Sequence, residues 1–215
     1  GTDSYQFTIN WGDGNIDTFN VPGPGFPGDF GFVANNVPGS ATHTYTAFGT
    51  YTISVTVTDD DGGVTSAVVG VVTVGASAEI VNDPVWGLLL GIHGTDFDDH
   101  ITVNQNVENG VQVFKVHANS WATPRTFAAA GVNIVSIHLC EGDDLAVISS
   151  GVDVPSILFG DEGNDHLNAG KHGTIVVGGD GDDMLIGGTG KDILIGGTGA
   201  DRIVGNSGDD LLIAG

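Results

Sequence analysis

The feature that most constrains this chain is a nine-residue period that runs without a break through its last third, residues 160–215. Each unit opens with a glycine-rich hexad and carries an aliphatic residue at position eight. Position six is Asp in five of the six units; the residues there are Asp165, Thr174, Asp183, Asp192, Asp201 and Asp210. A single phase held over six units is typical of a solenoid, in which each unit is a short element stacked on its neighbours.

The residues of each unit predict a tight turn followed by a very short strand. Glycine tolerates positive φ, so the hexad can turn, and the next three residues suffice for a strand whose central aliphatic side chain points to one face. Two units make one coil of eighteen residues, so units two apart stack directly above one another. The two predicted columns of turns hold Asp165, Asp183 and Asp201, and Thr174, Asp192 and Asp210.

Carboxylates stacked at strand spacing, about 4.8 Å, repel one another strongly unless a hard cation lies between them. Ca²⁺ suits this pattern because it takes six to eight oxygens and combines carboxylates with backbone carbonyls. On these residues the last third resembles the RTX (repeats-in-toxin) calcium-binding family. The resemblance implies an ion between successive turns of one column, bound by the position-six Asp and turn carbonyls. The alternative is a set of Gly-Asp turns without metal, as in other β-solenoids.

The column pairing predicts three intact ion sites: Asp165/Asp183, Asp183/Asp201 and Asp192/Asp210. A site that touches the turn with Thr174 should be weaker or empty, because the carboxylate is missing there. The resemblance adds turn residues at positions one and three to the candidate ligands; these are Gly160, Glu162, Gly178, Asp180, Gly187, Thr189, Gly196 and Thr198. Ca²⁺ is therefore the expected cofactor.

Composition supports a bound cation as the counter-charge. The net charge is −22 with only five Lys and Arg, which argues against nucleic acid and anionic membranes as partners. A hydrophobic content of 40% is too high for simple disorder. No run approaches eighteen apolar residues, so membrane insertion is not expected. Cys140 is the sole cysteine, which excludes a disulfide within the chain, and its apolar surroundings predict a buried, inert thiol.

The first 75 residues show the alternation of half-buried strands. Apolar and polar residues alternate over residues 5–11, 51–58 and 64–74, with turn clusters at 11–14 and 59–63 and a Pro/Gly-rich loop at 21–31. Such strands predict an antiparallel sandwich. The cluster Asp59, Asp60 and Asp61 could bind Ca²⁺ but is better explained as a solvated hairpin turn, and His43 as a packed, hydrogen-bonded residue.

The motifs WGDG, HTY and GTY together with the DDDGG turn resemble a PKD (polycystic kidney disease) domain, which has an Ig-like fold. PKD domains usually carry two more strands before the equivalent of residues 5–11, where this sequence begins. We therefore expect that strand to lie at an open sheet edge, or to gain a partner from another molecule or segment.

The middle of the chain repeats the pattern imperfectly. Residues 81–84 read as a junction, and residues 94–102, GTDFDDHIT, form a nonapeptide in which Phe97 takes the place of the fourth-position Gly. Residues 142–147, GDDLAV, resemble another opening repeat. We interpret residues 86–159 as degenerate coils that cap the solenoid. Their acidic residues are second-rank calcium ligands; they are Asp96, Asp98, Asp99, Asp143 and Asp144.

The sequence as a whole predicts an all-β chain: a partial Ig-like β-sandwich at 1–75, a linker with degenerate RTX-like solenoid coils at 76–159, and a calcium-binding parallel β-roll at 160–215. Paired carboxylates also occur in glycosidases, but here each pair lies in a Gly-rich turn, so no catalytic residue is expected.

The resemblances imply a non-catalytic, structural or adhesive module of a secreted or cell-surface bacterial protein, exported by type I machinery and folding as it binds Ca²⁺. Its expected partners are calcium ions and, through self-association into fibres, further copies or neighbouring domains. The alternative is an accessory region of a secreted hydrolase, a protease or glycosidase, whose catalytic domain lies elsewhere.

Overall fold

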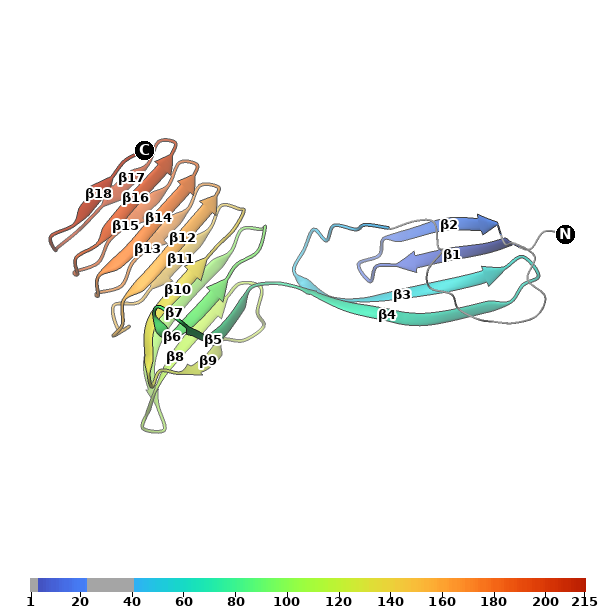
Figure 1. The fold of residues 1–215 in the computed structure, drawn as a ribbon, viewed down its shortest axis with the longest axis horizontal. Coiled ribbons are helices and arrows are strands. Elements are labelled where there is room, and N and C mark those ends of the chain that lie inside the picture. Colours follow the sequence, from blue (N-terminus) through green and yellow to red (C-terminus); the bar gives the residue numbers. More distant parts are fainter. Residues whose placement is uncertain (1–3, 23–40) are drawn as a thin grey trace. The chain divides into compact units, whose positions relative to one another are not determined.

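The computed structural model describes residues 4–22 and 41–215, and every helix-or-strand element in this part of the chain is a β-strand (Figure 1). The chain divides into two compact units, Gly1–Val74 and Gly75–Gly215. The further division of the second unit at residue 159 stays a prediction. No helix that is long and apolar enough to cross a membrane occurs among the described residues.

The N-terminal unit contains one four-stranded antiparallel sheet with the strand order β2-β1-β3-β4. Its strands are β1 (Ser4–Asn10), β2 (Ile16–Pro22), β3 (Gly49–Asp59) and β4 (Val64–Val74). Phe7 of β1 pairs with Phe19 of β2 on one side and with Val57 of β3 on the other. The expectation of an open edge at residues 5–11 is therefore wrong: the chain folds back at the Trp11 turn, so β2 and β3 cover both sides of β1.

An aromatic cluster surrounds the turn between β1 and β2. Trp11 is buried, donates a hydrogen bond from Nε1 to Asp17 Oδ2 (2.9 Å) and stacks on His43. Nε2 of His43 lies 2.7 Å from Asp13 Oδ2, and the Tyr45 hydroxyl donates to the Trp11 carbonyl (3.0 Å). His43 is thus packed and hydrogen-bonded. Most of the Pro/Gly segment predicted as a loop at 21–31 lies outside the described residues.

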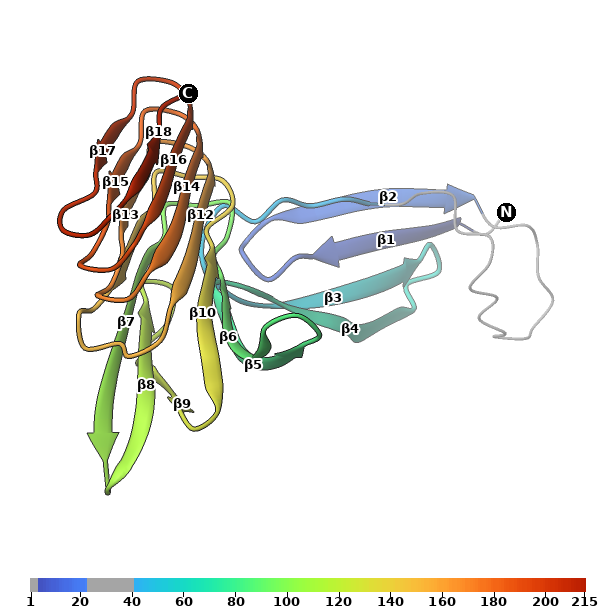
Figure 2. The same ribbon diagram turned by 60° about the vertical axis from the view of Figure 1, so that its left-hand side comes forward.

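The C-terminal unit consists of two seven-stranded sheets (Figure 2). The first has the order β18-β16-β14-β12-β10-β6-β5, with β5 (Ser77–Asp83), β6 (Gly87–His93), β10 (Val132–His138), β12 (Ser156–Glu162), β14 (Thr174–Asp180), β16 (Ile193–Thr198) and β18 (Leu211–Ile213). The second has the order β17-β15-β13-β11-β7-β8-β9, with β7 (His100–Glu108), β8 (Val111–Ala118), β9 (Arg125–Ala128), β11 (Leu145–Ile148), β13 (His166–Asn168), β15 (Met184–Ile186) and β17 (Arg202–Val204).

From β10 and β11 onward the strands pair in parallel, and in the repeats the register advances by eighteen residues, as the sequence predicts. Leu158, Val176 and Leu194 face inward from the first sheet, and Leu167 and Leu185 from the second, each with no exposed surface. Burial of the aliphatic side chain at position eight in the first four units therefore holds the two sheets together and points each hexad turn to an edge of the solenoid, whereas Leu212 of the last unit is 48% exposed.

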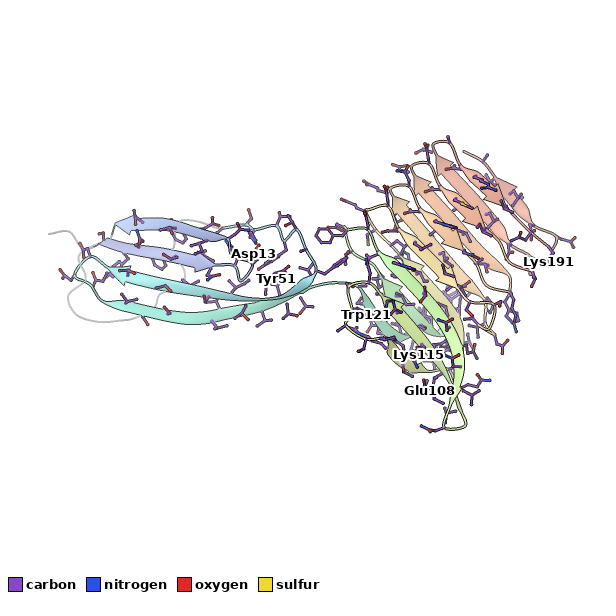
Figure 3. The ribbon with its side chains drawn as sticks, turned by 180° about the vertical axis from the view of Figure 1, so that it is seen from behind. Asp13, Tyr51, Glu108, Lys115, Trp121 and Lys191 are labelled. Carbon is purple, nitrogen blue, oxygen red and sulfur yellow. The ribbon has the colours of Figure 1, made fainter. Side chains whose placement is uncertain are left out.

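The N-terminal end of this unit departs from the parallel pattern. β5 pairs antiparallel with β6, and β8 lies antiparallel between β7 and β9, with Phe114 fully buried. Residues 81–84, expected to be a junction, instead form the end of β5 and its turn, in which Asp83 Oδ1 accepts hydrogen bonds from the Val85 and Trp86 N–H groups. The β7–β8 hairpin carries the ion pair between Lys115 and Glu108 (2.7 Å; Figure 3).

Candidate metal centre

A row of five Asp side chains runs along one edge of the solenoid, at the turns that lead from the first sheet to the second. This inner ladder consists of Asp99, Asp144, Asp165, Asp183 and Asp201. The backbone N–H of each donates to Oδ1 of the next, and the four N–Oδ1 distances lie between 2.6 and 3.0 Å. The aspartates of successive coils therefore stack in register. We call the space between the carboxylates of two neighbouring turns an interval of the ladder.

Each interior carboxylate of the ladder faces two intervals. Asp183 accepts the Asp165 N–H at Oδ1 (2.8 Å), on the side of the preceding turn. Its Oδ2 is buried and has no hydrogen-bond partner. The same holds along the ladder, and the partnerless buried oxygens are Asp99 Oδ1, Asp144 Oδ2, Asp165 Oδ2, Asp183 Oδ2 and Asp201 Oδ2. Buried carboxylate oxygens without partners are costly, so this row fits a cation as the missing partner.

The glycines at position one leave room for these oxygens. A Cβ on Gly178 would overlap Asp183 Oδ2 and lie 2.5 Å from the Gly196 carbonyl oxygen. A Cβ on Gly160 would likewise overlap Asp165 Oδ2 and lie 2.5 Å from the Gly178 carbonyl oxygen. Each of these two intervals therefore brings a carboxylate oxygen and a carbonyl oxygen to the same small space, where any larger residue would exclude them.

Burial and mutual repulsion make the inner ladder reluctant to ionise without a counter-charge. Burial raises the pKa of Asp144 to about 7 and that of Asp165 to about 6; the backbone N–H donors oppose the increase and the neighbouring carboxylates add to it. Burial also raises the pKa of Asp99 and Asp183. A cation would supply the positive charge that lets these groups stay ionised at neutral pH.

The donor set suits a hard cation that accepts carbonyl oxygens. Nowhere in residues 4–22 and 41–215 do three His, Cys, Asp or Glu side chains converge as in a site built from side chains alone. An interval of the ladder offers two carboxylates, so turn carbonyls or water must supply the remaining ligands. Ca²⁺ accepts such mixed oxygen sets in flexible geometry, whereas Zn²⁺ prefers Cys and His.

The second column, at the turns that lead back to the first sheet, differs from the inner ladder. Asp192 accepts the Thr174 N–H at Oδ1 (2.8 Å) and the Gly188 N–H at Oδ2 (2.7 Å), so both its oxygens have partners. The Thr174 hydroxyl donates to the His172 carbonyl (2.8 Å) and lies 3.2 Å from Ser156 Oγ. Asp210 accepts the Asp192 N–H at Oδ1 (3.0 Å). The two columns are therefore not equivalent; the sequence shows Thr174 in the second column but not the additional hydrogen bond to Asp192 Oδ2.

Comparison with known families agrees with this geometry. The profile of the RTX calcium-binding nonapeptide repeat, in four copies, matches residues 156–172 and 177–215. The profile of the PKD domain matches residues 2–72. The chain carries a PKD domain followed by RTX calcium-binding repeats. Searches of curated proteins and of solved structures found no match to it. The gap between the two RTX segments contains Thr174, the residue that breaks the Asp pattern.

The other candidate ligands of the RTX repeats lie around the ladder. Glu162, Asp180 and Thr198 stack in register on the exposed side of the turns, and the Thr198 hydroxyl donates to Asp180 Oδ1 (2.8 Å). Thr189 belongs to the second column and donates to the Lys171 carbonyl (3.1 Å). Gly187 lies beside Asp192 Oδ2, and Gly196 beside Asp201 Oδ2. The part that these residues play in calcium binding stays a prediction.

A second row of polar side chains, all exposed to solvent, connects the same turns by hydrogen bonds. The outer row consists of Asp98, Asp143, Asn164 and Asp182, all exposed, and each accepts through Oδ1 the backbone N–H of the following coil. Its N–Oδ1 distances are 2.8–3.1 Å. Hydrogen bonds in the outer row thus run opposite to those of the inner ladder, and Asp98 and Asp143 act there as structural acceptors. Asp96 is exposed.

Cys140 lies in one of the turns with a left-handed backbone (φ +80°) and is partly exposed, so the prediction of a buried thiol is wrong. Burial, followed by the charges of nearby carboxylates, raises the pKa of its thiol. The thiolate is therefore disfavoured, in line with an inert cysteine.

Proposed function

We propose that the chain is a calcium-binding structural module of a secreted or cell-surface protein and that its repeats become ordered when they bind Ca²⁺ outside the cell. The matches to RTX calcium-binding repeats and to a PKD domain, which are themselves non-catalytic, support this proposal. The observation that carries this proposal is the row of buried carboxylate oxygens without partners in the inner ladder.

The ladder's own residues account for a coupling between metal and folding. Asp165, Asp183 and Asp201 bring like charges into neighbouring coils, and their burial opposes ionisation. Bound Ca²⁺ would supply positive charge and oxygen coordination in the intervals between these carboxylates. The position-one glycines admit the carboxylate oxygens, and the buried aliphatic residues keep the coils in register. Metal binding and folding are linked in this way in many small metal-dependent domains.

Titration of the metal-free chain with Ca²⁺ tests the proposal. Far-UV circular dichroism should show a gain of β-structure with a midpoint of about 10⁻⁴–10⁻³ M, the range typical of extracellular calcium modules. Mg²⁺ is the matched control, because it demands a stricter octahedral shell and should act weakly. Native mass spectrometry counts the ions bound. A chain that takes up no Ca²⁺ and gives the same spectrum in chelator and in 10 mM Ca²⁺ would refute the proposal.

A further inference from the structure

The strand β4 forms a long open edge of the sheet in the PKD domain. Among the described strands it pairs only with β3, so it lies at the border of the sheet (Figure 1). It has 11 residues, whereas the other edge strands, β2, β5, β9, β17 and β18, have 3 to 7. An edge strand presents a row of backbone N–H and C=O groups that can pair with a strand of another chain.

β4 lacks the residues that usually prevent such pairing, namely charged residues and proline. β2 carries Asp17 and ends at Pro22, and β5 carries Glu79 and Asp83. β9 and β17 each contain an arginine. The sequence of β4, VTSAVVGVVTV, contains neither a charge nor a proline. The longest edge strand in the described part of the chain is therefore also one that is open to another strand.

Four valines of β4 are exposed close together. Val64, Val68 and Val71 pair with residues of β3 that point to one face of the sheet, and they are 60–66% exposed. Val69, beside them, is 59% exposed. Contiguous exposed apolar side chains mark interaction surfaces. The partner that suits this edge is an uncharged strand rich in β-branched residues, and β4 of a second copy is such a strand.

A β-bulge determines the register in which two copies of β4 can pair. The register of β4 against β3 shifts after Ile53, which leaves Val69 as an extra residue. The alternation of faces along β4 therefore shifts by one residue between Val68 and Val71. An antiparallel partner must carry the same shift at the same place, because residues that lie opposite each other point to one face. A second copy related by a two-fold axis between Val68 and Val69 meets this condition.

This axis brings β-branched residues together across the two strands. Val64 comes to lie opposite Thr73, on the same face of the sheet. Val68 and Val69 of both copies surround the axis, where they cover one another's exposed surface. From this geometry we infer that β4 pairs antiparallel with β4 of a second copy, so that the sheets of two PKD domains join into one continuous sheet.

The acidic residues next to β4 do not oppose this arrangement. The acidic turn at residues 59–61 precedes β4, and antiparallel pairing places its two copies at opposite ends of the paired strands. The strand spans roughly 37 Å, several times the screening length of about 8 Å at physiological salt. A strip of this length and about 10 Å in thickness buries about 400 Å² on each copy. This area is smaller than that of a standard interface, so the dimer should be weak.

Sedimentation equilibrium of the whole chain in 10 mM Ca²⁺, from about 1 μM to 1 mM protein, tests the pairing. The mass should rise from 21.9 kDa toward twice that value. Val69→Lys brings two ammonium groups together beside the axis and should weaken the dimer about fivefold or more, because like charges across strands are destabilising. Val107→Lys is the matched control, since Val107 is 64% exposed in β7 of the other unit, and it should leave the dimer unchanged.

An exchange of charge at the axis tests the register itself. Val69→Glu alone should weaken the dimer as Val69→Lys does. An equimolar mixture of the two variants should restore it, because opposite charges then meet across the axis. Restoration in the mixture also shows that both variants are folded.

A chain that stays monomeric at about 1 mM would overturn the inference. A dimer that Val69→Lys leaves intact would also overturn it, because the contact then lies elsewhere on the chain. The same holds for a mixture of charge variants that associates no better than either variant alone. The pairing uses no calcium ligand, so these results do not depend on whether the repeats bind Ca²⁺.

Discussion

Replacement of Asp183 by Asn should have opposite effects on stability with and without calcium. Asp183 is an interior member of the inner ladder and contributes Oδ1 to the interval with Asp165 and Oδ2 to the interval with Asp201. The change removes one charge from both intervals while preserving the shape and the Oδ1 acceptor. We therefore expect the loss of two bound ions.

The magnitude follows from mass action. A site with a Kd of about 0.1–1 mM contributes about 1.4–2.7 kcal/mol to the free energy of unfolding at 10 mM Ca²⁺. Loss of two such sites should cost about 3–5 kcal/mol. In chelator the sign reverses, because burial raises the pKa of Asp183 and a neutral amide avoids the cost of ionising there at pH 7. The variant should then be more stable than the unmodified chain.

Urea unfolding in 10 mM Ca²⁺ measures the first effect, and the amount of β-structure seen by circular dichroism in chelator, with and without urea, measures the second. Asp182→Asn is the matched control, because Asp182 is the adjacent exposed residue of the outer row and its Oδ1 acceptor for the Ala200 N–H is retained. Asp210→Asn should lose one ion, since within the described residues Asp210 borders only the interval with Asp192. Equal losses for Asp183→Asn and Asp210→Asn, or equal destabilisation by Asp183→Asn in both buffers, would refute the assignment of two intervals to Asp183.

Three further predictions concern pH and packing. The metal-free repeats should lose about 1–3 kcal/mol of unfolding free energy as the pH rises from 4.5 to 7.5, because the pKa values of Asp144 (about 7) and Asp165 (about 6) lie above that of an unfolded Asp. Urea titrations at several pH values measure this loss, and a free energy of unfolding that does not change with pH would contradict it. The PKD domain should show the opposite trend below pH 4, detected by Trp11 fluorescence, because hydrogen bonds from Asn15 and His43 outweigh desolvation and lower the pKa of Asp13 to about 2. Gly178→Ala should remove calcium binding in its interval and cost about 1–3 kcal/mol in thermal unfolding, because the added Cβ overlaps Asp183 Oδ2. Gly70→Ala is the control and should be nearly neutral, because no atom lies within 4 Å of its added Cβ.

The sequence predicts the regular part of the solenoid because its period encodes both packing and turns. The aliphatic residue at position eight, such as Leu185, can be buried only if every unit repeats the same turn, so the column of Asp183 and Asp201 follows from the phase alone. The same logic fails where other residues replace the glycines. Turn 139–144 was recognisable only from Gly142 onward, since Leu139 and Cys140 hide its first two positions.

Other features depend on contacts that no local pattern encodes. Apart from Thr174 the two columns look alike in sequence, but Oδ2 of Asp192 accepts a hydrogen bond from the Gly188 N–H, which depends on the backbone of one turn. Pairing of β1 on both sides depends on where the chain returns after the Trp11 turn. The antiparallel strands β5, β8 and β9 carry no repeat period, and they pair because each adjoins the strand before or after it in a hairpin.

Because neighbouring intervals of the inner ladder share a carboxylate, their occupancies are not independent. An ion held between Asp165 and Asp183 fixes the orientation of Asp183 and so prepares an oxygen for the interval with Asp201. Coupling free energies of about 1–3 kcal/mol between adjacent sites correspond to about 5–150-fold in affinity. The ladder should therefore fill cooperatively, with a Hill coefficient above one, so that a small rise in free calcium stiffens the whole edge of the solenoid at once.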